Sequence, residues 1–348
     1  MTANRSSLRL PAEWEPQAAV LIAWPHVDTD WAERLAAVET TYIALAVAIT
    51  RFQPLMVVVA DDTLQTHVAA ALRRAGANVQ RVRFVQLPYD DTWLRDSGPL
   101  TLCAADGHCQ LNDFRFTGWG GKYDAAQDDA LVAGLVAAGV FGHARHQRID
   151  WALEGGAVES DGAGTLLTTW HCLTQRHPEL SRADMAAMLI DSLHADRVLW
   201  LDHGYLQGDD TDAHIDTLAR FAPDNRIVYQ ACDDPNDVHF GELQRMAADL
   251  AALRTAGGQP YRLQPLPWPQ PIVEDGRRLA ASYANYLIIN DAVLVPAYGD
   301  VVDAEAARRI GSAYPGREVV SIPCRPLIWQ NGSLHCITMQ MPAGSMCA

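Results

Sequence analysis

Four motifs that carry chemically reactive side chains recur along this sequence at a nearly constant step. Asp96 lies in Asp-Ser-Gly-Pro, Glu154 in Leu-Glu-Gly-Gly, His214 in Asp-Ala-His-Ile-Asp and Cys336 in Gly-Ser-Leu-His-Cys. The step from Asp96 to Glu154 is 58 residues, the next is 60, and Cys336 follows His214 by 122, which is twice 61. A small polar cluster at 282–285 occupies the skipped position. Units of about 60 residues suit blades arranged around an axis, where equivalent positions face the centre. Because the residue types do not repeat, chance spacing is the alternative.

Short apolar runs alternate with amphipathic segments throughout the chain. The runs predict strands at 57–60, 164–168, 198–201, 227–229, 286–289 and 292–295. Apolar residues at helical spacing predict helices at 31–51, 125–140, 181–194 and 240–256. Since the two classes of segment interleave, the sequence predicts an α/β fold.

The chain is 348 residues long, which allows one large domain or two ordinary ones. Gly257–Pro271 is the one stretch rich enough in proline and glycine to serve as a linker. This stretch also carries four large apolar residues, namely Tyr261, Leu263, Leu266 and Trp268. We therefore interpret it as a packed surface loop inside a single domain that spans residues 1–348.

The net charge and the length of the apolar stretches limit which partners and which cellular location we expect. The chain has 27 Lys plus Arg against 42 Asp plus Glu, a net charge of −15, which disfavours nucleic acid and anionic membranes as partners. An acidic chain suits a small cationic substrate, although solubility alone is an alternative explanation. Met1–Pro16 lacks the pattern of a secretory signal, which predicts a cytoplasmic location. Apolar stretches such as Ala18–Trp24 and Ile43–Ile49 are shorter than the roughly 20 residues of a membrane span.

Several families of catalytic motif are absent from the sequence. It contains no Gly-x-Ser-x-Gly, no His-Glu-x-x-His and no phosphate-binding Gly-x-x-x-x-Gly-Lys segment. Its seven cysteines are odd in number and include no Cys-x-x-Cys pair, which disfavours a disulfide framework or structural zinc. One reading left is a divalent metal site. If residues 210–216 are extended, four potential ligands share one face: Asp210, Asp212, His214 and Asp216.

The other reading is nucleophilic catalysis by Cys336 with His214 as proton carrier. Gly332 and Ser333 permit a tight turn that presents the cysteine to a cleft. His214 and Asp216 share a face of an extended segment, and Trp93 can stack on a flat cation. A cysteine is also a common core residue, and a histidine beside a carboxylate is often a structural pair, so both readings stay open.

Taken together, the motifs resemble the agmatine deiminase and bacterial peptidyl-arginine deiminase-like family of guanidine-modifying enzymes. The resemblance covers nearly the whole chain and rests on ordered motifs at Leu10–Pro16 with Ala23–His26, Trp93–Pro99, Asn112–Phe114 with Gly118–Tyr123, Leu153–Gly156, Asp212–Asp216 and Gly332–Thr338. It implies a five-bladed α/β propeller of ββαβ units around a pseudo-fivefold axis, which would account for the recurring step.

The resemblance also implies roles for the reactive residues. Asp96 and Asp216 match the acids that bind the planar guanidinium, each able to accept a pair of its N–H donors. Cys336 matches the nucleophile, which attacks the guanidinium carbon and forms a covalent amidino-thioether. His214 matches the general acid and base, and Glu154 matches a further acid that orients His214 or the substrate. No metal or organic cofactor is implied.

The expected substrate is agmatine, hydrolysed to N-carbamoylputrescine and ammonia. Its ammonium tail predicts a pocket with acidic and aromatic walls, for which the candidates are Trp93, Trp119, Trp24, Asp90 and Asp91. Free or peptidyl arginine is the alternative, with Arg115 as a carboxylate ligand. Ser333 stands where the family usually has asparagine, and Thr117–Tyr123 resembles the peptidyl-arginine branch. An amidinotransferase, a metal-dependent hydrolase and a non-catalytic guanidine-binding protein are further alternatives, and family habit suggests a homo-oligomer.

The expected site contains an electrostatic conflict. A thiolate is the nucleophile, yet nearby carboxylates raise the pKa of Cys336. A bound cation would offset this effect. We therefore expect substrate binding itself to favour ionisation of Cys336.

Overall fold

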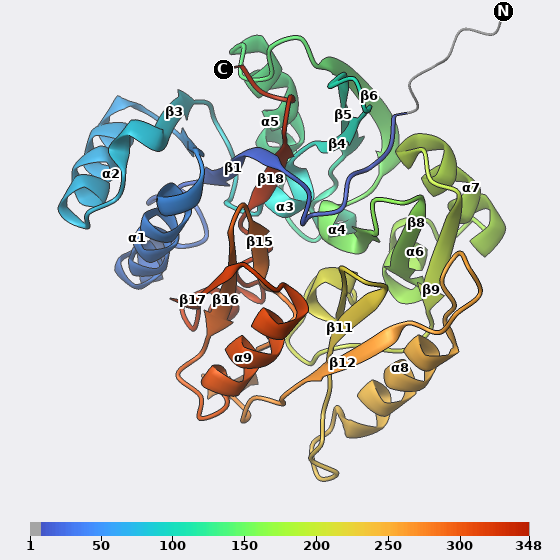
Figure 1. Ribbon diagram of the computed structural model, residues 1–348. Helices are drawn as coiled ribbons and strands as arrows, with labels where there is room; N and C mark the ends of the chain where they lie inside the picture. The colour runs from blue at the N-terminus through green and yellow to red at the C-terminus, as the bar shows by residue number, and fades with distance from the viewer. Residues whose placement is uncertain (1–7, 348) are drawn as a thin grey trace, which may run out of the picture.

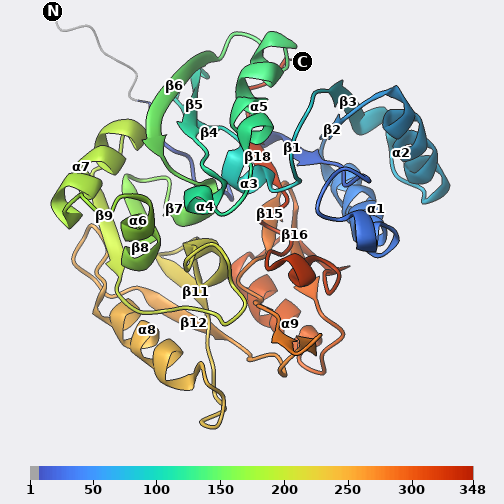
Figure 2. The same ribbon diagram turned by 180° about the vertical axis from the view of Figure 1, so that it is seen from behind.

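The computed structural model describes residues 8–347, and these form a mixed α/β fold (Figures 1 and 2). This confirms the predicted α/β class. Residues 1–7, part of the segment examined for a secretory signal, and Ala348, the last residue of the predicted domain, lie outside the described residues.

Five sheets among the described residues follow one plan. A first strand pairs antiparallel with a second, which pairs parallel with a third. The sheets are β4 (Leu100–Cys103), β5 (Cys109–Arg115) and β6 (Arg145–Ala152); β7 (Val158–Ser160), β8 (Thr165–Thr169) and β9 (Arg197–Leu201); β10 (Ala219–Ala222), β11 (Arg226–Gln230) and β12 (Arg262–Leu266); β15 (Leu287–Ile289), β16 (Ala292–Ala297) and β17 (Glu318–Pro323); and β18 (Met339–Pro342), β1 (Gln17–Ala23), β2 (Leu55–Val59) and β3 (Val82–Gln86). The last sheet has a fourth strand, β3, which continues the parallel pairing.

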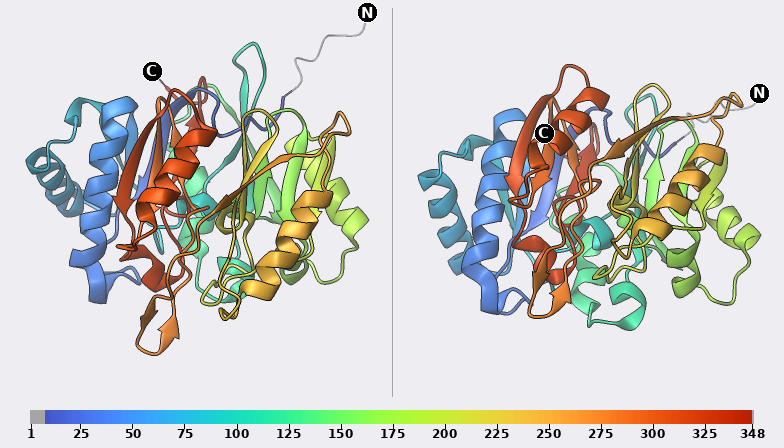
Figure 3. Two further views of the ribbon diagram at one scale, coloured as in Figure 1. Left: turned by 60° about the horizontal axis from the view of Figure 1, so that its bottom comes forward. Right: turned by 90° about the horizontal axis from the view of Figure 1, so that it is seen from below.

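Helices form the crossovers to the parallel strands, because a parallel connection must return the chain to the same edge of the sheet. They are α1 (Leu35–Phe52), α2 (Asp62–Arg74), α5 (Ala126–Ala137), α6 (Trp170–Arg176), α7 (Arg182–Leu193), α8 (Phe240–Ala252) and α9 (Asp303–Ala313). Two short helices, α3 (Leu94–Ser97) and α4 (Gly118–Gly121), lie in loops. Figure 3 shows the main helices on the outside of the sheets and the small hairpin of β13 (Val273–Glu274) and β14 (Arg277–Arg278) projecting at one side.

Two segments from opposite ends of the sequence meet in one sheet. β1 pairs antiparallel with β18, with Val20 opposite Gln340 and Leu21 opposite Met339. Figure 1 shows this blue strand beside the dark red one. The pairing brings the segment after Cys336 next to the start of the described chain.

The predicted strands and helices are present in the structure. The six runs correspond to β2, β8, β9, β11, β15 and β16, and the four helical segments to α1, α5, α7 and α8. The interpretation of Gly257–Pro271 as a loop is wrong in part, because the segment contains β12, parallel to β11. Only Leu266 of this edge strand is fully buried, and Pro265 has no backbone N–H group to donate. The segment therefore lacks the continuous apolar pattern of a buried strand.

One helical stretch, Ala32–Phe52, is long and apolar enough to cross a membrane by length and composition alone. The helix of a soluble core passes the same test. Here α1 packs against β17 and buries Tyr42, Leu45 and Ile49 in the largest apolar cluster. The predicted location stays a prediction.

A buried ionic cluster occupies the interior beside the β1–β18 pair. The Arg220 guanidinium, which is fully buried, donates from Nε to Glu159 at 3.0 Å and from a terminal nitrogen to Glu13. His335 contacts the same Glu13 carboxylate at 2.7 Å, and Arg95 lies 3.2 Å from it. We refer to Glu13, Arg95, Glu159, Arg220 and His335 as the central charge cluster. It joins segments that are far apart in the sequence.

We expect Arg220→Met to lower the free energy of unfolding by about 3 to 5 kcal/mol, because buried Glu159 would lose its cation and Glu13 would lose one of the two arginines that it contacts. Urea denaturation followed by circular dichroism measures this. The matched control is Arg308→Met, which removes an exposed arginine paired with Glu305 and should change stability little. Equal effects of the two substitutions would contradict the account.

Candidate active site

Each reactive residue predicted from the recurring step lies just before the first strand of its sheet. Asp96 is in α3 and precedes β4, Glu154 precedes β7, and His214 precedes β10. Cys336 precedes β18, and Asn285 occupies the same place before β15. The step therefore reflects equivalent positions in successive sheets.

Three of the predicted acids and bases converge on Gly156. A Cβ atom added to Gly156 would lie 2.6 Å from His214 Nδ1, 2.8 Å from Asp96 Oδ1 and 3.2 Å from Asp216 Oδ2. The Gly156 amide donates to Asp96 Oδ1 at 3.0 Å, and Trp119 Nε1 donates to Asp96 Oδ2 at 2.9 Å. Glycine is needed here because any side chain would fill the space between the reactive groups.

The Cys336 thiol contacts Asp216 and Asn285. Its Sγ lies 3.6 Å from Asp216 Oδ2 and 3.2 Å from Asn285 Nδ2, and the same amide nitrogen lies 3.2 Å from Asp216 Oδ2. All three side chains are buried. The cysteine nucleophile predicted from the sequence is thus beside one of the two predicted guanidinium-binding acids.

His335 fixes the orientation of Asp216. Its Nδ1 contacts Asp216 Oδ2 at 2.7 Å, while its Nε2 contacts Glu13 Oε1 at 2.7 Å. Burial raises the pKa of Asp216, but the hydrogen bond from His335 and the charges of His335, His214 and Arg220 together outweigh this effect, so that the net pKa is lowered. Asp216 is therefore held as a carboxylate, and it connects the thiol to the central charge cluster.

Glu154 lies between a cation and the predicted proton carrier. Arg176 on α6 donates from Nε to Glu154 Oε1 at 2.7 Å, and Glu154 Oε2 lies 3.5 Å from His214 Nε2. On the other side of the ring, His214 Nδ1 lies 3.6 Å from Asp96 Oδ1. The imidazole thus lies between two carboxylates.

Four buried polar atoms at this site have no hydrogen-bond partner among residues 8–347. They are Asp216 Oδ1, Glu154 Oε2, and both ring nitrogens of His214. Buried oxygens normally find donors, and an unpaired one costs free energy. The carboxylate oxygens are suited to a ligand that brings several N–H donors.

Burial and charge shift the ionisation of the reactive groups. Burial, with the charges of Asp216 and Asp96, raises the pKa of the Cys336 thiol well above its usual value. Burial lowers the pKa of His214, but the charge of Asp96 and contacts with Cys172 and Glu154 outweigh it, so the net pKa is raised. Burial raises the pKa of Asp96 to about 6, against the opposing effect of His214. The resting site therefore favours a neutral Cys336 thiol and a protonated His214 imidazole.

A cavity of about 850 Å³ reaches both Cys336 and Asp96. Its size lies within the range typical of small-molecule sites. Predicted wall residues Trp93, Trp119 and Asp90 line it. Further acids on its walls are Asp30, Glu33, Asp91, Asp124, Asp128 and Asp210, against the cations Lys122 and Arg277. The cavity is thus predominantly acidic, as expected for a cationic ligand.

Not every residue predicted for the cavity walls lines the cavity. Trp24 is wrong as a wall residue, because it is fully buried in the largest apolar cluster and donates from Nε1 to Glu39 at 3.2 Å. Asp90 does line the cavity, but its carboxylate accepts from Gln127 at 2.7 Å at the start of α5. Asp90 therefore anchors a helix. Arg115 pairs with Asp150 at 3.0 Å and does not line the cavity.

The metal site predicted from residues 210–216 is not formed. Asp212 and Ala213 have φ values of 64° and 70°, so the segment turns, and His214 begins the short 3₁₀ helix η4 (Ile215–Thr217). Asp212 instead pairs with Arg176 at 2.6 Å and with Lys122 at 2.9 Å. The four potential ligands do not share a face, because the backbone is not extended.

Sequence reasoning missed several residues of the site. Asn285 could have been found, since it lies in the polar cluster at the skipped repeat position. His335 could also have been found, since it directly precedes the predicted nucleophile in the same motif. Cys172 and Arg176 on α6, near His214 and Glu154, carry no spacing signal at all.

The fold and the site are those of a guanidine-modifying enzyme. Solved structures agree over almost the whole length. A protein of Porphyromonas gingivalis, provisionally assigned as an arginine deiminase, is 46% identical with a TM-score of 0.91, over 98% of this chain and 99% of that one. C. jejuni agmatine deiminase, solved with substrate bound, is 30% identical with a TM-score of 0.87, over 96% of each chain.

Sequence relatives define the family. The agmatine deiminase of Stutzerimonas stutzeri is 33% identical over 98% of this chain and 97% of that protein. The pattern of the Porphyromonas-type peptidyl-arginine deiminase family matches residues 9–342. The chain belongs to this family, which confirms the resemblance found in the motifs.

We expect Gly156→Ala to lower the release of ammonia from a guanidine substrate by about 100-fold or more, because the added methyl group would displace His214 and Asp96. A steady-state ammonia assay measures this. Gly241→Ala is the control, since a Cβ there meets no atom within 4 Å. Retention of full activity by Gly156→Ala would show that the convergence point is not the reaction centre.

Proposed function

We propose that this chain hydrolyses agmatine to N-carbamoylputrescine and ammonia through a covalent intermediate on Cys336. The observation that carries the proposal is a pair of unpartnered carboxylate oxygens at the site, one of them on Asp216, the carboxylate that contacts the Cys336 thiol at 3.6 Å. Asp216 Oδ1 and Glu154 Oε2 lack donors within the described chain, and a guanidinium supplies several N–H groups with a positive charge. The acidic cavity and the agmatine deiminase relatives support the same choice.

In the first step, Asp96 and Asp216 hold the guanidinium plane, and the thiolate of Cys336 attacks the central carbon. A C–S bond forms and the carbon becomes tetrahedral. The imidazolium of His214 then gives its proton to the departing amino group, and the C–N bond breaks to release ammonia. The product of this step is an amidino-thioether on Cys336.

In the second step, neutral His214 removes a proton from a water molecule, which attacks the same carbon. The C–S bond breaks, the electron pair returns to sulfur, and the hydroxyl oxygen loses its remaining proton to solvent as the C=O bond of the departing ureido product forms. Glu154 and Asp96 flank the imidazole and stabilise its charged form, which suits a group that must alternate between acid and base. No step requires a metal or an organic cofactor.

We also propose that the five sheets are the blades of a five-bladed α/β propeller around a pseudo-fivefold axis, within a single domain. The repeated strand plan and the equivalent positions of the reactive residues support this arrangement. Formation of a homo-oligomer and a cytoplasmic location stay predictions.

Free or peptidyl arginine is the second candidate substrate. The family to which the chain belongs and the 850 Å³ volume of the cavity favour it, because agmatine alone is small. The cations on the wall are already bound, however. Lys122 contacts Asp212 at 2.9 Å, and Arg277 contacts Asn331 at 2.9 Å. A substrate carboxylate would have to compete for them, which favours agmatine.

We expect Cys336→Ala to lower ammonia release by roughly 10⁴-fold or more, because it removes the nucleophile. Cys232→Ala, which removes another buried cysteine, should keep most of the activity. The assay should compare agmatine, arginine and peptides with a C-terminal arginine, and should detect the ureido product. Turnover of the peptides alone would contradict the agmatine assignment, whereas guanidine binding without ureido product would contradict catalysis.

We further expect a bound guanidinium to lower the apparent pKa of Cys336, since its charge offsets the carboxylates and the burial that raise it. The thiolate absorbance of wild type minus that of Cys336→Ala, followed against pH, reports this pKa. Titrations with and without a non-reactive guanidine are compared. An identical midpoint in both titrations would refute substrate-assisted ionisation.

A further inference from the structure

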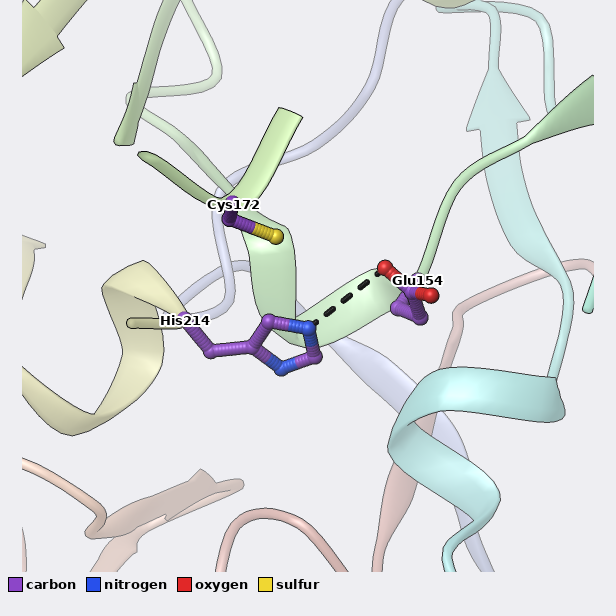
Figure 4. Close-up of side chains that lie close together, drawn as sticks. All are labelled: Glu154, Cys172 and His214. Carbon is purple, nitrogen blue, oxygen red and sulfur yellow. Dashed lines mark ion pairs between the residues drawn. The ribbon is translucent and has the colours of Figure 1, made fainter. Parts of the chain in front are cut away.

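Glu154, Cys172 and His214 form a second cluster of potential ligands beside the nucleophile. Each offers one ligand atom, and the three atoms lie within 4.8 Å of one another (Figure 4). All three side chains are buried. They come from separate elements: Glu154 precedes the 3₁₀ helix η3 (Gly155–Ala157), Cys172 is on α6, and His214 precedes η4.

We propose that these three residues form an inhibitory binding site for a borderline-soft divalent cation such as Zn²⁺. Zinc accepts cysteine sulfur, histidine nitrogen and carboxylate oxygen in a tetrahedral arrangement. Three protein ligands leave the fourth position for water. The binding claim does not depend on the enzymatic activity, whereas the inhibitory effect rests on the proposed function.

The ligand atoms are available because the chain does not use them elsewhere. Glu154 Oε2 and both nitrogens of His214 are buried without a hydrogen-bond partner among the described residues. Arg176 takes the other oxygen, Oε1, and so leaves Oε2 turned toward the ring. Glu154 Oε2 and His214 Nε2 are 3.5 Å apart. Ligand atoms around tetrahedral zinc are separated by roughly 3.3 to 3.6 Å, given the usual bond lengths.

The site would control the enzyme through His214. Coordination requires a thiolate and a neutral imidazole, so binding displaces one proton from Cys172 and one from the imidazolium. A histidine whose lone pair is bound to the cation can neither protonate ammonia nor deprotonate water. Cys336 is not a ligand in this arrangement, because its sulfur contacts Asp216 and Asn285 and is not part of the cluster.

The experiment measures Zn²⁺ binding to the full chain without substrate, by competition with a fluorescent chelator. We expect micromolar or tighter binding to the wild type, and a loss of more than about tenfold in Cys172→Ser, since even changes to outer-shell partners cost that much. Cys336→Ala and Cys232→Ser should bind as the wild type does. Co²⁺ in place of Zn²⁺ should give a thiolate-to-metal absorption band in the wild type that is absent in Cys172→Ser.

Ammonia release measured in parallel should be inhibited by Zn²⁺ in the wild type, restored by a chelator, and resistant to Zn²⁺ in Cys172→Ser. Equal Zn²⁺ affinity in Cys172→Ser, a loss of binding confined to Cys336→Ala, or the absence of a thiolate band would overturn the proposal. If Cys172→Ser does not fold, the Co²⁺ spectra of wild type and His214→Ala decide it, because the band should be lost in His214→Ala; a band that persists there comes from another cysteine and overturns the proposal. If the chain binds zinc through Cys172 but releases no ammonia, the proposed function is refuted and the zinc-binding claim stands.

Discussion

The Asp216 carboxylate is the group on which the rest of the site depends. One of its oxygens contacts His335 at 2.7 Å, Asn285 at 3.2 Å and the Cys336 sulfur at 3.6 Å. A carboxylate with no solvent contact must be paired, and His335 meets this need while it also binds Glu13 in the central charge cluster. The position of the nucleophile is therefore set by a buried polar network that joins distant parts of the chain, and the surface loops around the cavity are free to define the substrate.

Within residues 8–347, the second oxygen of the same carboxylate has no donor, and neither has one oxygen of the Glu154 carboxylate. These two unpaired oxygens destabilise the empty site, and a cation with several N–H groups would form hydrogen bonds with them. Burial and the charges of Asp216 and Asp96 raise the pKa of the Cys336 thiol, whereas the charge of Asp96 raises the pKa of His214 against the effect of burial. A bound substrate thus supplies the positive charge that the carboxylates lack in the empty site. A soft metal ion bound to His214, Glu154 and Cys172 would supply positive charge at the same place.

The sequence predicted the α/β class and the main strands and helices, because these depend on local periodicity. The recurring step singled out Cys336, Asp96 and His214 as candidates, and the resemblance to the family implied their roles. The edge strand β12 was missed because an exposed strand with Pro265 has no apolar pattern. Trp24 was wrongly predicted to line the cavity, because the sequence pattern does not distinguish a tryptophan in the core from one in a cavity wall. Residues such as Arg176, whose contacts arise only from tertiary packing, have no signal along the chain.

The central claim is that Cys336 becomes covalently bonded to the guanidinium carbon during turnover. Mass spectrometry of the enzyme, quenched with acid while it turns over agmatine, tests this directly. The account predicts that the peptide containing Cys336 gains the mass of agmatine less that of ammonia. Agmatine turnover with no such adduct at any quench time, or with the adduct on another residue, would contradict it.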